Sequence, residues 1–235
     1  MIDSGELGAW LRLIETPRLG RDSARKLLAA FGSPDAAIAA TTAARREVVG
    51  PQQAVALAKP ADTLEALIQA TIAWLADDAG APRDVIPLGD PRYPAALFEA
   101  PDPPLLLYVH GRAELLQAQA IAIVGSRSPT PQGATNAQAF ASHLSHGGLT
   151  VISGLALGID AAAHTGALEG AASTIAVVGT GLDQIYPKRN QRLGHRIIRD
   201  GLIVSEYSLG MPPLALNFPR RNRIIAGLAL GTLVV

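Results

Sequence analysis

Three arginines and one asparagine fill positions 220 to 223, directly in front of the apolar run at positions 224 to 226. Pro219 suits the first position of a helix, where its missing N–H is not needed. The arginines would then lie beside the positive end of that helix, where cations are unfavourable unless an anion is bound. Guanidinium groups and the free N–H groups of a first helical turn bind phosphate together. The segment therefore predicts an exposed phosphate-binding surface, and a solvated arginine cluster is the plainer alternative. The side chains concerned are Arg220, Arg221, Asn222 and Arg223.

Four predicted strands end in loops that carry glycine, hydroxyl and basic side chains. Glycines allow backbone N–H groups to approach a phosphate, and helices starting after Gly133 and Gly158 add an attractive dipole. Asp160 is placed to cap or brace the second loop, which follows Ser153. An i,i+4 hydrogen bond between Asp160 and His164 is the simplest explanation of their spacing. Ordinary turn hydroxyls account for Ser126 and Ser153 equally well. The candidate nucleic-acid-binding residues of these loops are Gly125, Ser126, Arg127 and Lys188, whereas Ser153, Gly154, Gly158, Asp160 and Gly179 are expected to shape the loops.

Strand and helix patterns alternate from residue 120 onward. Short continuous apolar runs are typical of strands that are buried on both faces of a parallel sheet. We therefore expect an α/β domain with a doubly wound, Rossmann-like and mostly parallel sheet. In such a sheet the ligand lies at the carboxyl ends of the strands. The predicted strands are 121–124, 149–152, 174–178, 202–204 and 232–235, and the predicted helices are 133–146, 159–169, 189–200 and 220–228.

The first 80 residues are rich in alanine and leucine at helical spacing. Glycine-containing turns at 16–20 and 48–54 predict a small all-α domain that is similar to SAM-like or helix-hairpin-helix modules. A helical bundle without DNA contacts is an equally good account, because this half is slightly acidic. We place the boundary near Gly80, which gives domains 1–80 and 81–235. The chain ends on an apolar run without a turn or cap, so we expect the second domain to be incomplete at its C-terminus.

Positive charge gathers at the end of a chain whose formal net charge is +0. Residues 186–235 carry 8 Lys/Arg and 2 Asp/Glu, whereas residues 1–100 carry 10 and 13. This asymmetry favours an anionic partner, and nucleic acid first. No apolar run reaches the roughly 20 residues that cross a membrane. The sequence has zero cysteines and no basic leader segment, which suits the cytoplasm. GxGxxG, GxxxxGK[ST] and HExxH are all missing, so we expect neither a cofactor nor a metal.

Five motifs, in this order along the chain, together resemble the DNA-processing protein A family, whose members are called DprA or Smf. The resemblance covers about residues 85–235, and the helical domain in front is similar to the SAM-like module that many members carry. The motifs are Gly125-Ser126-Arg127, the run from Ser153 to Asp160 with His164, Tyr186-Pro187 with Asn190, Ser205-Glu206, and the run from Phe218 to Gly227.

The resemblance implies a bacterial protein that binds and protects single-stranded DNA and loads the recombinase RecA onto it in natural transformation. It implies an extended Rossmann domain and no established catalytic activity. It also implies a DNA-binding pocket at Gly125, Ser126 and Arg127, with the arginine segment nearby and Phe218 stacking on a base. Family members continue beyond the equivalent of Val235, often into a winged-helix domain. Dimerisation and RecA contacts are associated with those later parts, so we expect a homodimer for the full-length protein.

Two other functions compete with this one. Rossmann-like sheets without GxGxxG also occur in nucleotide phosphoribohydrolases, and an enzyme of that type would need Glu206 or Asp183 as its general acid or base. No catalytic set with a convincing spacing is present, so we expect no enzyme activity. A structural scaffold without a ligand would give the positive charge after residue 186 no role.

Overall fold

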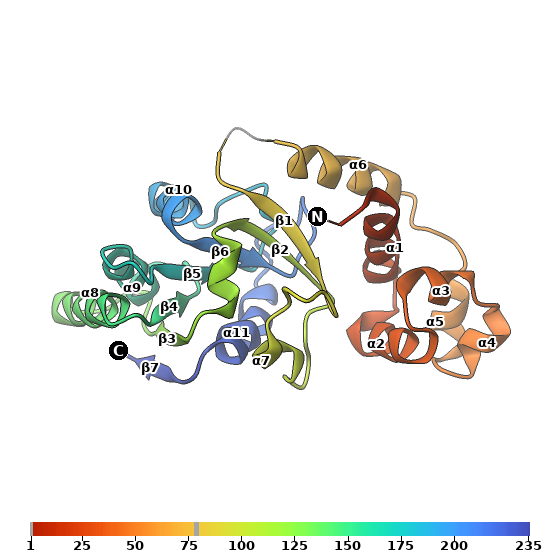
Figure 1. Ribbon diagram of the computed structural model, residues 1–235, viewed down its shortest axis with the longest axis horizontal. Coiled ribbons are helices and arrows are strands. Elements are labelled where there is room, and N and C mark those ends of the chain that lie inside the picture. Colours follow the sequence, from red (N-terminus) through yellow and green to blue (C-terminus); the bar gives the residue numbers. More distant parts are fainter. Residues whose placement is uncertain (1, 78–79) are drawn as a thin grey trace. The chain divides into compact units, whose positions relative to one another are not determined.

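The computed structural model describes residues 2–77 and 80–235, which divide into two compact units (Figure 1). Unit 1 consists of residues 2–76 together with Pro104–Leu106, and unit 2 contains the other described residues. The stretch in which the sequence places the domain boundary includes residues 78 and 79, and these two lie outside the described part. Each unit has its own buried core and is described by itself.

Unit 1 is helical, and polar caps start several of its helices. The side chain of Asp3 accepts a hydrogen bond from the N–H of Glu6, and Ser33 and Thr41 cap their helices in the same way. Leu7 and Leu11 of the first helix are almost fully buried, as their four-residue spacing predicts. The helices are α1 (Ser4–Glu15), α2 (Gly20–Phe31), α3 (Pro34–Ala39), α4 (Thr42–Arg46), α5 (Pro51–Ala56) and α6 (Leu64–Leu75).

Arg45 holds the short helices of unit 1 together. Its side chain is buried and donates hydrogen bonds to the carbonyls of Ala37, Ile38, Ala40 and Ala54 at 2.6–3.2 Å. These carbonyls belong to helix ends, where backbone acceptors lack partners within the helix. Burial lowers the pKa of the Arg45 guanidinium, but four acceptors compensate its charge. A buried arginine therefore joins the short helices of this small bundle through hydrogen bonds, where an apolar side chain would be usual.

Unit 2 contains a mostly parallel sheet with the strand order β1-β2-β6-β5-β4-β3-β7. Strands β3, β4, β5 and β6 are parallel neighbours, β7 pairs with the other side of β3, and β2 pairs antiparallel with β6. The mostly parallel Rossmann-like sheet expected from the sequence is thus confirmed. The strands are β1 (Arg83–Pro87), β2 (Leu106–Gly111), β3 (Ala120–Val124), β4 (Thr150–Ser153), β5 (Thr174–Val177), β6 (Leu202–Ser205) and β7 (Thr232–Val234).

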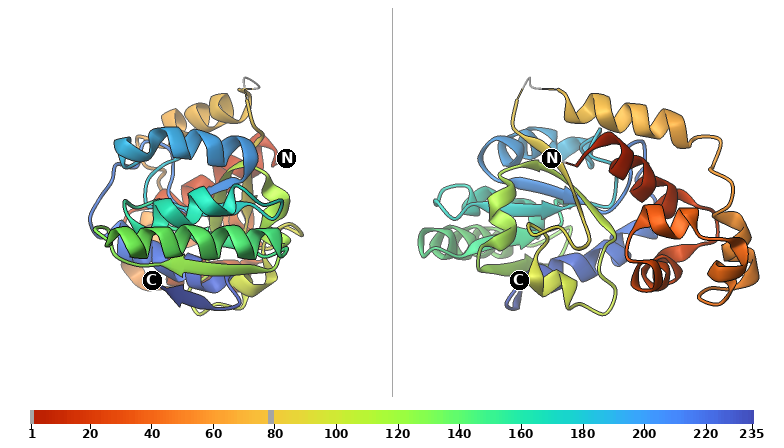
Figure 2. Two further views of the ribbon diagram at one scale, coloured as in Figure 1. Left: turned by 90° about the vertical axis from the view of Figure 1, so that its left-hand side faces the viewer. Right: turned by 45° about the vertical axis from the view of Figure 1, so that its right-hand side comes forward.

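Helices cover both faces of this sheet. Alternate strand residues supply the two cores: Val151 packs with α8 and α9, whereas Ile152 packs on the opposite face with Ile224 of α11. Figure 2 shows α8, α9 and α10 as one layer, with α11 on the other side of the sheet. The helical segments of unit 2 are α7 (Ala95–Phe98), η1 (Ala113–Gln117), α8 (Pro131–His146), α9 (Ile159–Ala167), η2 (Lys188–Asn190), α10 (Gln191–Asp200) and α11 (Asn217–Leu228).

The strand order creates a switch point beside β3. The chain steps from β3 to β6 in one direction and then returns to place β7 on the opposite side of β3. Loops that leave such neighbouring strands over opposite faces of the sheet diverge, and the space between them is the usual ligand crevice. The carboxyl end of β3 therefore lies where a ligand is expected.

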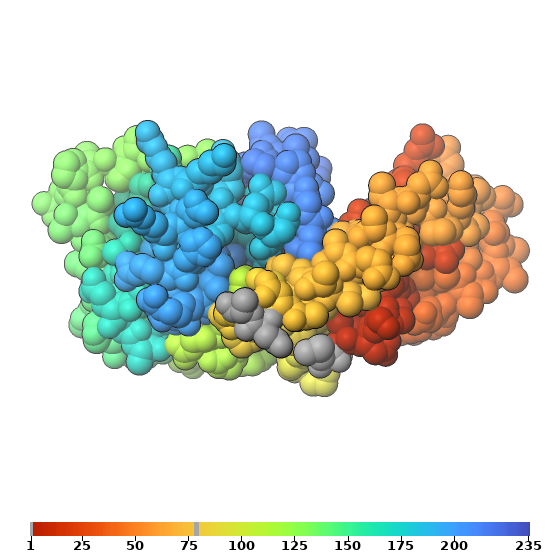
Figure 3. Space-filling model, turned by 90° about the horizontal axis from the view of Figure 1, so that it is seen from above, coloured from red at the N-terminus to blue at the C-terminus, as the bar shows by residue number. Residues whose placement is uncertain are grey.

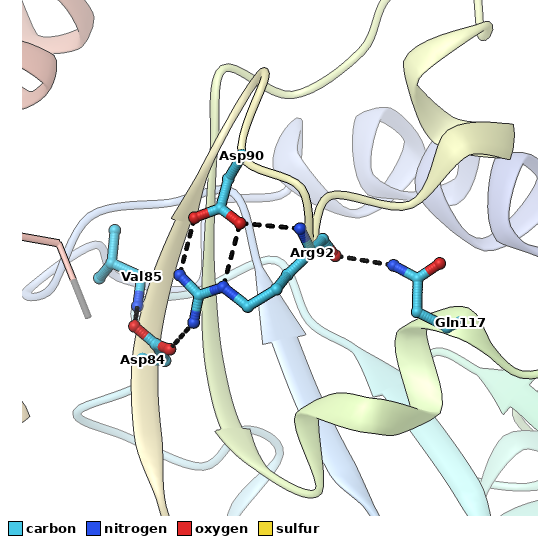
Figure 4. A network of polar contacts seen from close by, with 5 residues as sticks. All are labelled: Asp84, Val85, Asp90, Arg92 and Gln117. Atoms are coloured by element: carbon cyan, nitrogen blue, oxygen red, sulfur yellow. Dashed lines mark hydrogen bonds and ion pairs between the residues drawn. The ribbon is translucent and has the colours of Figure 1, made fainter.

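The start of α11 and the first sheet strand differ from the sequence expectation. The helix begins at Asn217, so Pro219 is its third residue and not its first. Strand β1 was not predicted. It is held by Arg92, whose guanidinium contacts the carboxylates of Asp84 and Asp90 and whose carbonyl accepts a hydrogen bond from Gln117 at 2.8 Å (Figure 4). This network fixes β1 to the turn that follows it.

Candidate nucleic-acid interface

A cleft of about 490 Å³ lies at the carboxyl end of β3, at the switch point of the sheet. Three parts of the chain enclose it. They are the loop that begins at Gly125 after β3, which we call the first loop, the Tyr186-Pro187 segment and the start of α11. These parts come from distant places in the chain, and the sheet brings them together. The residues that line the cleft are Val124, Gly125, Arg127, Ala156, Asp160, Tyr186, Pro213, Ala215, Phe218, Pro219, Arg221, Asn222 and Ile225.

Arg127 and two aromatic rings form the open side of this cleft. The guanidinium carbon of Arg127 lies 5.8 Å from the centre of the Phe218 ring, within the range of a cation–π contact. The rings of Tyr186 and Phe218 are 5.7 Å apart at an interplanar angle of 33°. Arg127 is exposed and Tyr186 is 42 % exposed, so a cation and an aromatic platform face solvent together.

Arg221 does not belong to the exposed surface that the sequence suggested. Only 4 % of this residue is exposed, and its guanidinium donates a hydrogen bond to the carbonyl of Val177 at the end of β5. The guanidinium also fills the space next to Gly154, where a larger residue would collide with it. Burial lowers the pKa of Arg221, and the charge of Asp160 opposes that shift. The expectation of an exposed Arg221 is wrong because α11 turns this side chain toward the sheet.

Arg223 is likewise occupied within the protein. Its guanidinium contacts the Glu206 carboxylate at 2.5 and 2.8 Å and the Asp102 carboxylate at 2.9 Å. Burial lowers the pKa of Arg223, but the two carboxylates outweigh it and raise the pKa above its ordinary value. A guanidinium that already binds two carboxylates is a poor phosphate ligand. The segment therefore presents Arg220 and Asn222 to solvent, whereas the guanidinium groups of Arg221 and Arg223 have partners within the protein.

The second loop, residues 154–158, is held by side chains of unit 2. One carboxylate oxygen of Asp160 accepts hydrogen bonds from the N–H groups of Gly154 and Ala156, at 3.1 and 3.2 Å. Asn190 donates to the carbonyls of Leu155 and Ala156 at 2.9 and 3.0 Å. The N–H groups of Gly154 and Ala156 are thus bonded within the protein, and Asp160 braces the loop as the sequence suggested. This loop supports the cleft and leaves phosphate binding to side chains.

His164 completes the support of that loop. Its Nε2 accepts a hydrogen bond from the N–H of Leu155 at 3.2 Å, and its Nδ1 lies 2.7 Å from the hydroxyl of Thr174. Because that hydroxyl donates to the carbonyl of Val151, Nδ1 must carry the proton that joins His164 to Thr174. Burial lowers the pKa of His164 to about 3, which keeps the imidazole neutral. The expected i,i+4 bond to Asp160 is wrong, since each side chain has other partners.

The remaining predicted loop residues lie where the loops touch one another. Gly158 has a φ of +80° and lies directly against the carbonyl of Ser126, where a side chain would collide. The hydroxyl of Ser126 accepts a hydrogen bond from the N–H of Ser128 at 3.0 Å. Ser153 is buried and donates to the carbonyl of Ile123, and the carbonyl of Gly179 accepts from Asn217. Lys188 is exposed and lines a neighbouring cleft.

The two carboxylates that an enzyme would need are both engaged. Glu206 binds Arg223, and its side chain is 5 % exposed. Asp183 accepts a hydrogen bond from the N–H of Gly210 at 2.9 Å. Neither residue lines the cleft that holds Arg127. These two carboxylates therefore give no support to a general acid or base in this cleft.

Tyr186 and Asn190 are site residues that the sequence marked only as parts of a motif. Tyr186 extends the aromatic surface, and the side chain of Asn190 fixes the second loop. Their signal was the Tyr-Pro-x-x-Asn spacing after the third strand. Pro213 and Ala215 also line the cleft, and no signal marked them beforehand. Across the described residues no helix is long and apolar enough to span a membrane, and no group of three or more metal-ligating side chains lies together.

Residues 84–235 match the model of a family described as DNA recombination-mediator protein A. The chain belongs to this family. Residues 5–66 match a second model, the DprA-like N-terminal HHH domain. Together the two matches cover most of the helical unit and most of the α/β unit of this family member.

Curated relatives of this family member include DNA processing protein DprA from Streptococcus pneumoniae, 48 % identical over 145 residues. That match covers 62 % of this chain and 51 % of the relative. Protein Smf from Synechocystis is 47 % identical over 150 residues, which are 62 % of this chain and 38 % of the relative. Protein Smf from Escherichia coli is 41 % identical over 169 residues, covering 72 % and 44 %. The matches thus span about half or less of the relatives' length.

Two solved structures of the family are similar to this chain. DNA processing protein A from Streptococcus pneumoniae matches 99 % of this chain and 77 % of its own, with a TM-score of 0.79 and 33 % identity. DNA processing protein A from Helicobacter pylori, described for its single-stranded DNA binding mode, matches 66 % and 69 %, with a TM-score of 0.60 and 32 % identity. The folds therefore agree across both units in the first case.

Proposed function

We propose that this chain binds single-stranded DNA at the cleft beside β3, with little preference for sequence. The observation that carries the proposal is the exposed guanidinium of Arg127 over the Phe218 ring, next to Tyr186. Single-strand sites combine cations that hold phosphates with aromatic rings on which bases stack, and stacking contributes about 1–3 kcal/mol for each base. The family member from Helicobacter pylori, described as binding single-stranded DNA, supports the same ligand.

The residues of the cleft divide into contacts and supports. Arg127 holds a phosphate, Phe218 and Tyr186 stack on bases, and Arg220 and Asn222 add polar contacts at the rim. Gly125 and Ser126 shape the loop that carries Arg127, and Lys188 takes a phosphate outside the cleft. The buried residues Arg221, Asp160 and His164 act only by holding the loops in place. Ser153, Gly154, Gly158, Gly179 and Arg223 have the same supporting role.

The wider role in the proposal comes from the family. A DNA recombination mediator brings a recombinase to single-stranded DNA, and we propose RecA as that partner, in the cytoplasm of a bacterium during natural transformation. We also propose that the full-length protein is a homodimer, that it protects incoming strands, and that it performs no catalytic step. Assembly of RecA on a strand covered by single-strand binding protein, with and without this protein, tests the mediator role.

The binding proposal is tested with fluorescence anisotropy of labelled oligo-dT. We expect tighter binding to the single strand than to a duplex of equal length, because aromatic faces such as those of Phe218 and Tyr186 stack on bases that a duplex keeps paired and stacked. Arg127→Ala should weaken binding of every sequence about equally and lower the slope of log K against log salt by roughly 0.7. Arg127→Lys should restore only part of the affinity, because an ammonium cannot form the bidentate fork.

Arg46→Ala is the matched control, since it removes one exposed cation from α4 of unit 1. Equal or tighter binding to duplex, or an unchanged salt slope in a folded Arg127→Ala protein, contradicts the proposal. The phosphoribohydrolase alternative is tested in parallel by incubation with nucleoside monophosphates. Release of free base that Asp183→Asn abolishes, or that Glu206→Gln abolishes in a protein that circular dichroism shows to be folded, would favour that enzyme activity over simple binding.

A further inference from the structure

A second and larger cleft of unit 2 borders the DNA cleft. Its volume is about 1040 Å³, and it is enclosed by the start of β1, by His110 of β2, by residues 182–189 and by α10. The segment 182–189 and α10 lie on the face shown in Figure 3. Tyr186 and Pro213 line both clefts, so the two share part of their walls. A strand that extends from the first cleft across Tyr186 would therefore reach the second.

The rim of this second cleft carries more basic than acidic side chains. Arg189 and Lys188 are exposed and form no ion pair within the described part of the chain. Arg83 is paired with Asp77 at 2.7 Å, and the one carboxylate of Asp183, which accepts a hydrogen bond from the N–H of Gly210, opposes only one of the two exposed cations. The uncompensated charge is therefore positive, and it fits a polyanion.

Part of the lining of the second cleft is apolar. Leu182, Ile185 and Ile198 line it together with Pro187. His110 is 9 % exposed, and burial together with the nearby charge of Arg83 lowers its pKa to about 4. An apolar interior below a cationic rim matches the two chemistries of a nucleotide, which are flat apolar base faces and a charged phosphate. His195 of α10 adds a planar ring at the rim.

We propose that the second cleft is a further subsite for the same DNA strand. The strand passes over Tyr186, Arg189 holds a phosphate beyond the one held by Arg127, and the next bases lie against His195 and Ile198. The inference rests on the proposed function, because the strand must occupy the first cleft as well. It implies that affinity depends on strand length, since short strands fill one cleft and longer strands fill both.

The test measures the affinity of the intact chain for oligo-dT strands of about 4 to 16 nucleotides, the range that single-strand sites span. The variant is the double change Arg189→Ala/His195→Ala, and Arg46→Ala is the control. We expect the shortest strands to bind the double variant as they bind the wild type. Long strands should lose about tenfold in affinity, as for one charge-assisted hydrogen bond, and their salt slope should fall by roughly 0.7.

A second variant reports directly on occupancy. His195→Trp places an indole at the exposed rim, and we expect long strands to quench its fluorescence while the shortest strands do not. Equal losses at all lengths in the double variant, no loss at any length, or no quenching of the indole by long strands would overturn the subsite. None of these outcomes contradicts DNA binding at the first cleft. That proposal would be contradicted by a different result, namely normal DNA binding by the Arg127→Ala protein.

Discussion

Arg220 and Arg221 are neighbours in the sequence, but only Arg220 reaches solvent. The apolar residues Ile224, Ile225 and Leu228 follow Arg221 at intervals of three, four and seven, which places them all on one face of α11. This spacing was the signal that Arg221 points into the protein. Composition alone suggested three equivalent arginines, because the charge of a segment carries no information about the face on which each side chain lies.

Arg221→Ala should destabilise the fold much more than Arg220→Ala. The first change leaves the carbonyl of Val177 without this donor and opens a cavity beside Gly154, so we expect a loss of about 2–4 kcal/mol in the free energy of unfolding. The second change affects an exposed side chain and should stay within about 0.5 kcal/mol. Urea unfolding of both variants measures the difference. Equal stabilities would show that the buried guanidinium contributes nothing.

His164 makes the stability of the protein depend on pH. Its pKa is about 3 when folded and roughly 6.5 when unfolded. As the pH falls below about 6.5, His164 therefore takes up a proton in the unfolded chain but stays neutral in the folded protein. Stability is full above about pH 6.5 and decreases below it by about 1.4 kcal/mol per pH unit, until the pH reaches the folded value.

The measurement is urea unfolding of the wild type and His164→Gln between pH 7 and pH 5. The free energy of unfolding should fall less steeply with pH in the variant, by the slope that corresponds to about one proton. His143→Gln changes an exposed histidine of α8 and serves as the control. His110, with a pKa lowered to about 4, adds to the decrease in all three proteins. Identical pH profiles for the wild type and His164→Gln would contradict the neutral buried imidazole.

At the scale of elements, α11 joins the end of β6 to the loop before β2. Arg223 makes this connection through Glu206 on one side and Asp102 on the other. Arg223→Ala should lower the free energy of unfolding by about 2 kcal/mol, below the roughly 3–5 kcal/mol of a fully buried pair, because Asp102 is partly exposed.

The same variant separates structure from DNA contact. If Arg223 is structural, the slope of log K against log salt for oligo-dT stays at the wild-type value while stability falls. A lower slope with unchanged stability would return Arg223 to the phosphate surface. Glu206→Gln should reproduce the loss of stability, since it weakens the same ion pair from the other partner.

The parallel strands could be predicted, but strand β1 at one edge of the sheet could not. Runs such as 121–124 and 174–178 are short and almost wholly apolar, a pattern typical of strands covered on both faces, and they became β3 and β5. Arg83–Pro87 gave no such signal, because two of its five residues are charged and a proline ends it. The antiparallel direction of β2 also has no local signal, since it depends on a partner strand far along the chain.

At the scale of the whole molecule, the two units suggest independent folding. The domain boundary near Gly80 remains a prediction, and a shortened chain that starts at Pro82 tests it. This chain keeps the hydrogen bond from the N–H of Gly111 to the carbonyl of Pro82 and loses the Asp77 partner of Arg83. We expect it to unfold cooperatively, with a circular dichroism spectrum that retains the α/β contribution. An unfolded shortened chain beside a folded intact one would show that the boundary is wrong.

The antiparallel pairing of β2 with β6 has a consequence for folding during synthesis on the ribosome. Tyr108 pairs with Ser205, about 100 residues later in the chain. A ribosome needs roughly 5–20 seconds to add that many residues. Until then the apolar run of β2 can pair only with β1, and two strands alone are barely stable in water. The nascent chain therefore exposes an unpaired, apolar strand edge for several seconds during synthesis. A chaperone bound at the ribosome would protect this edge in that interval.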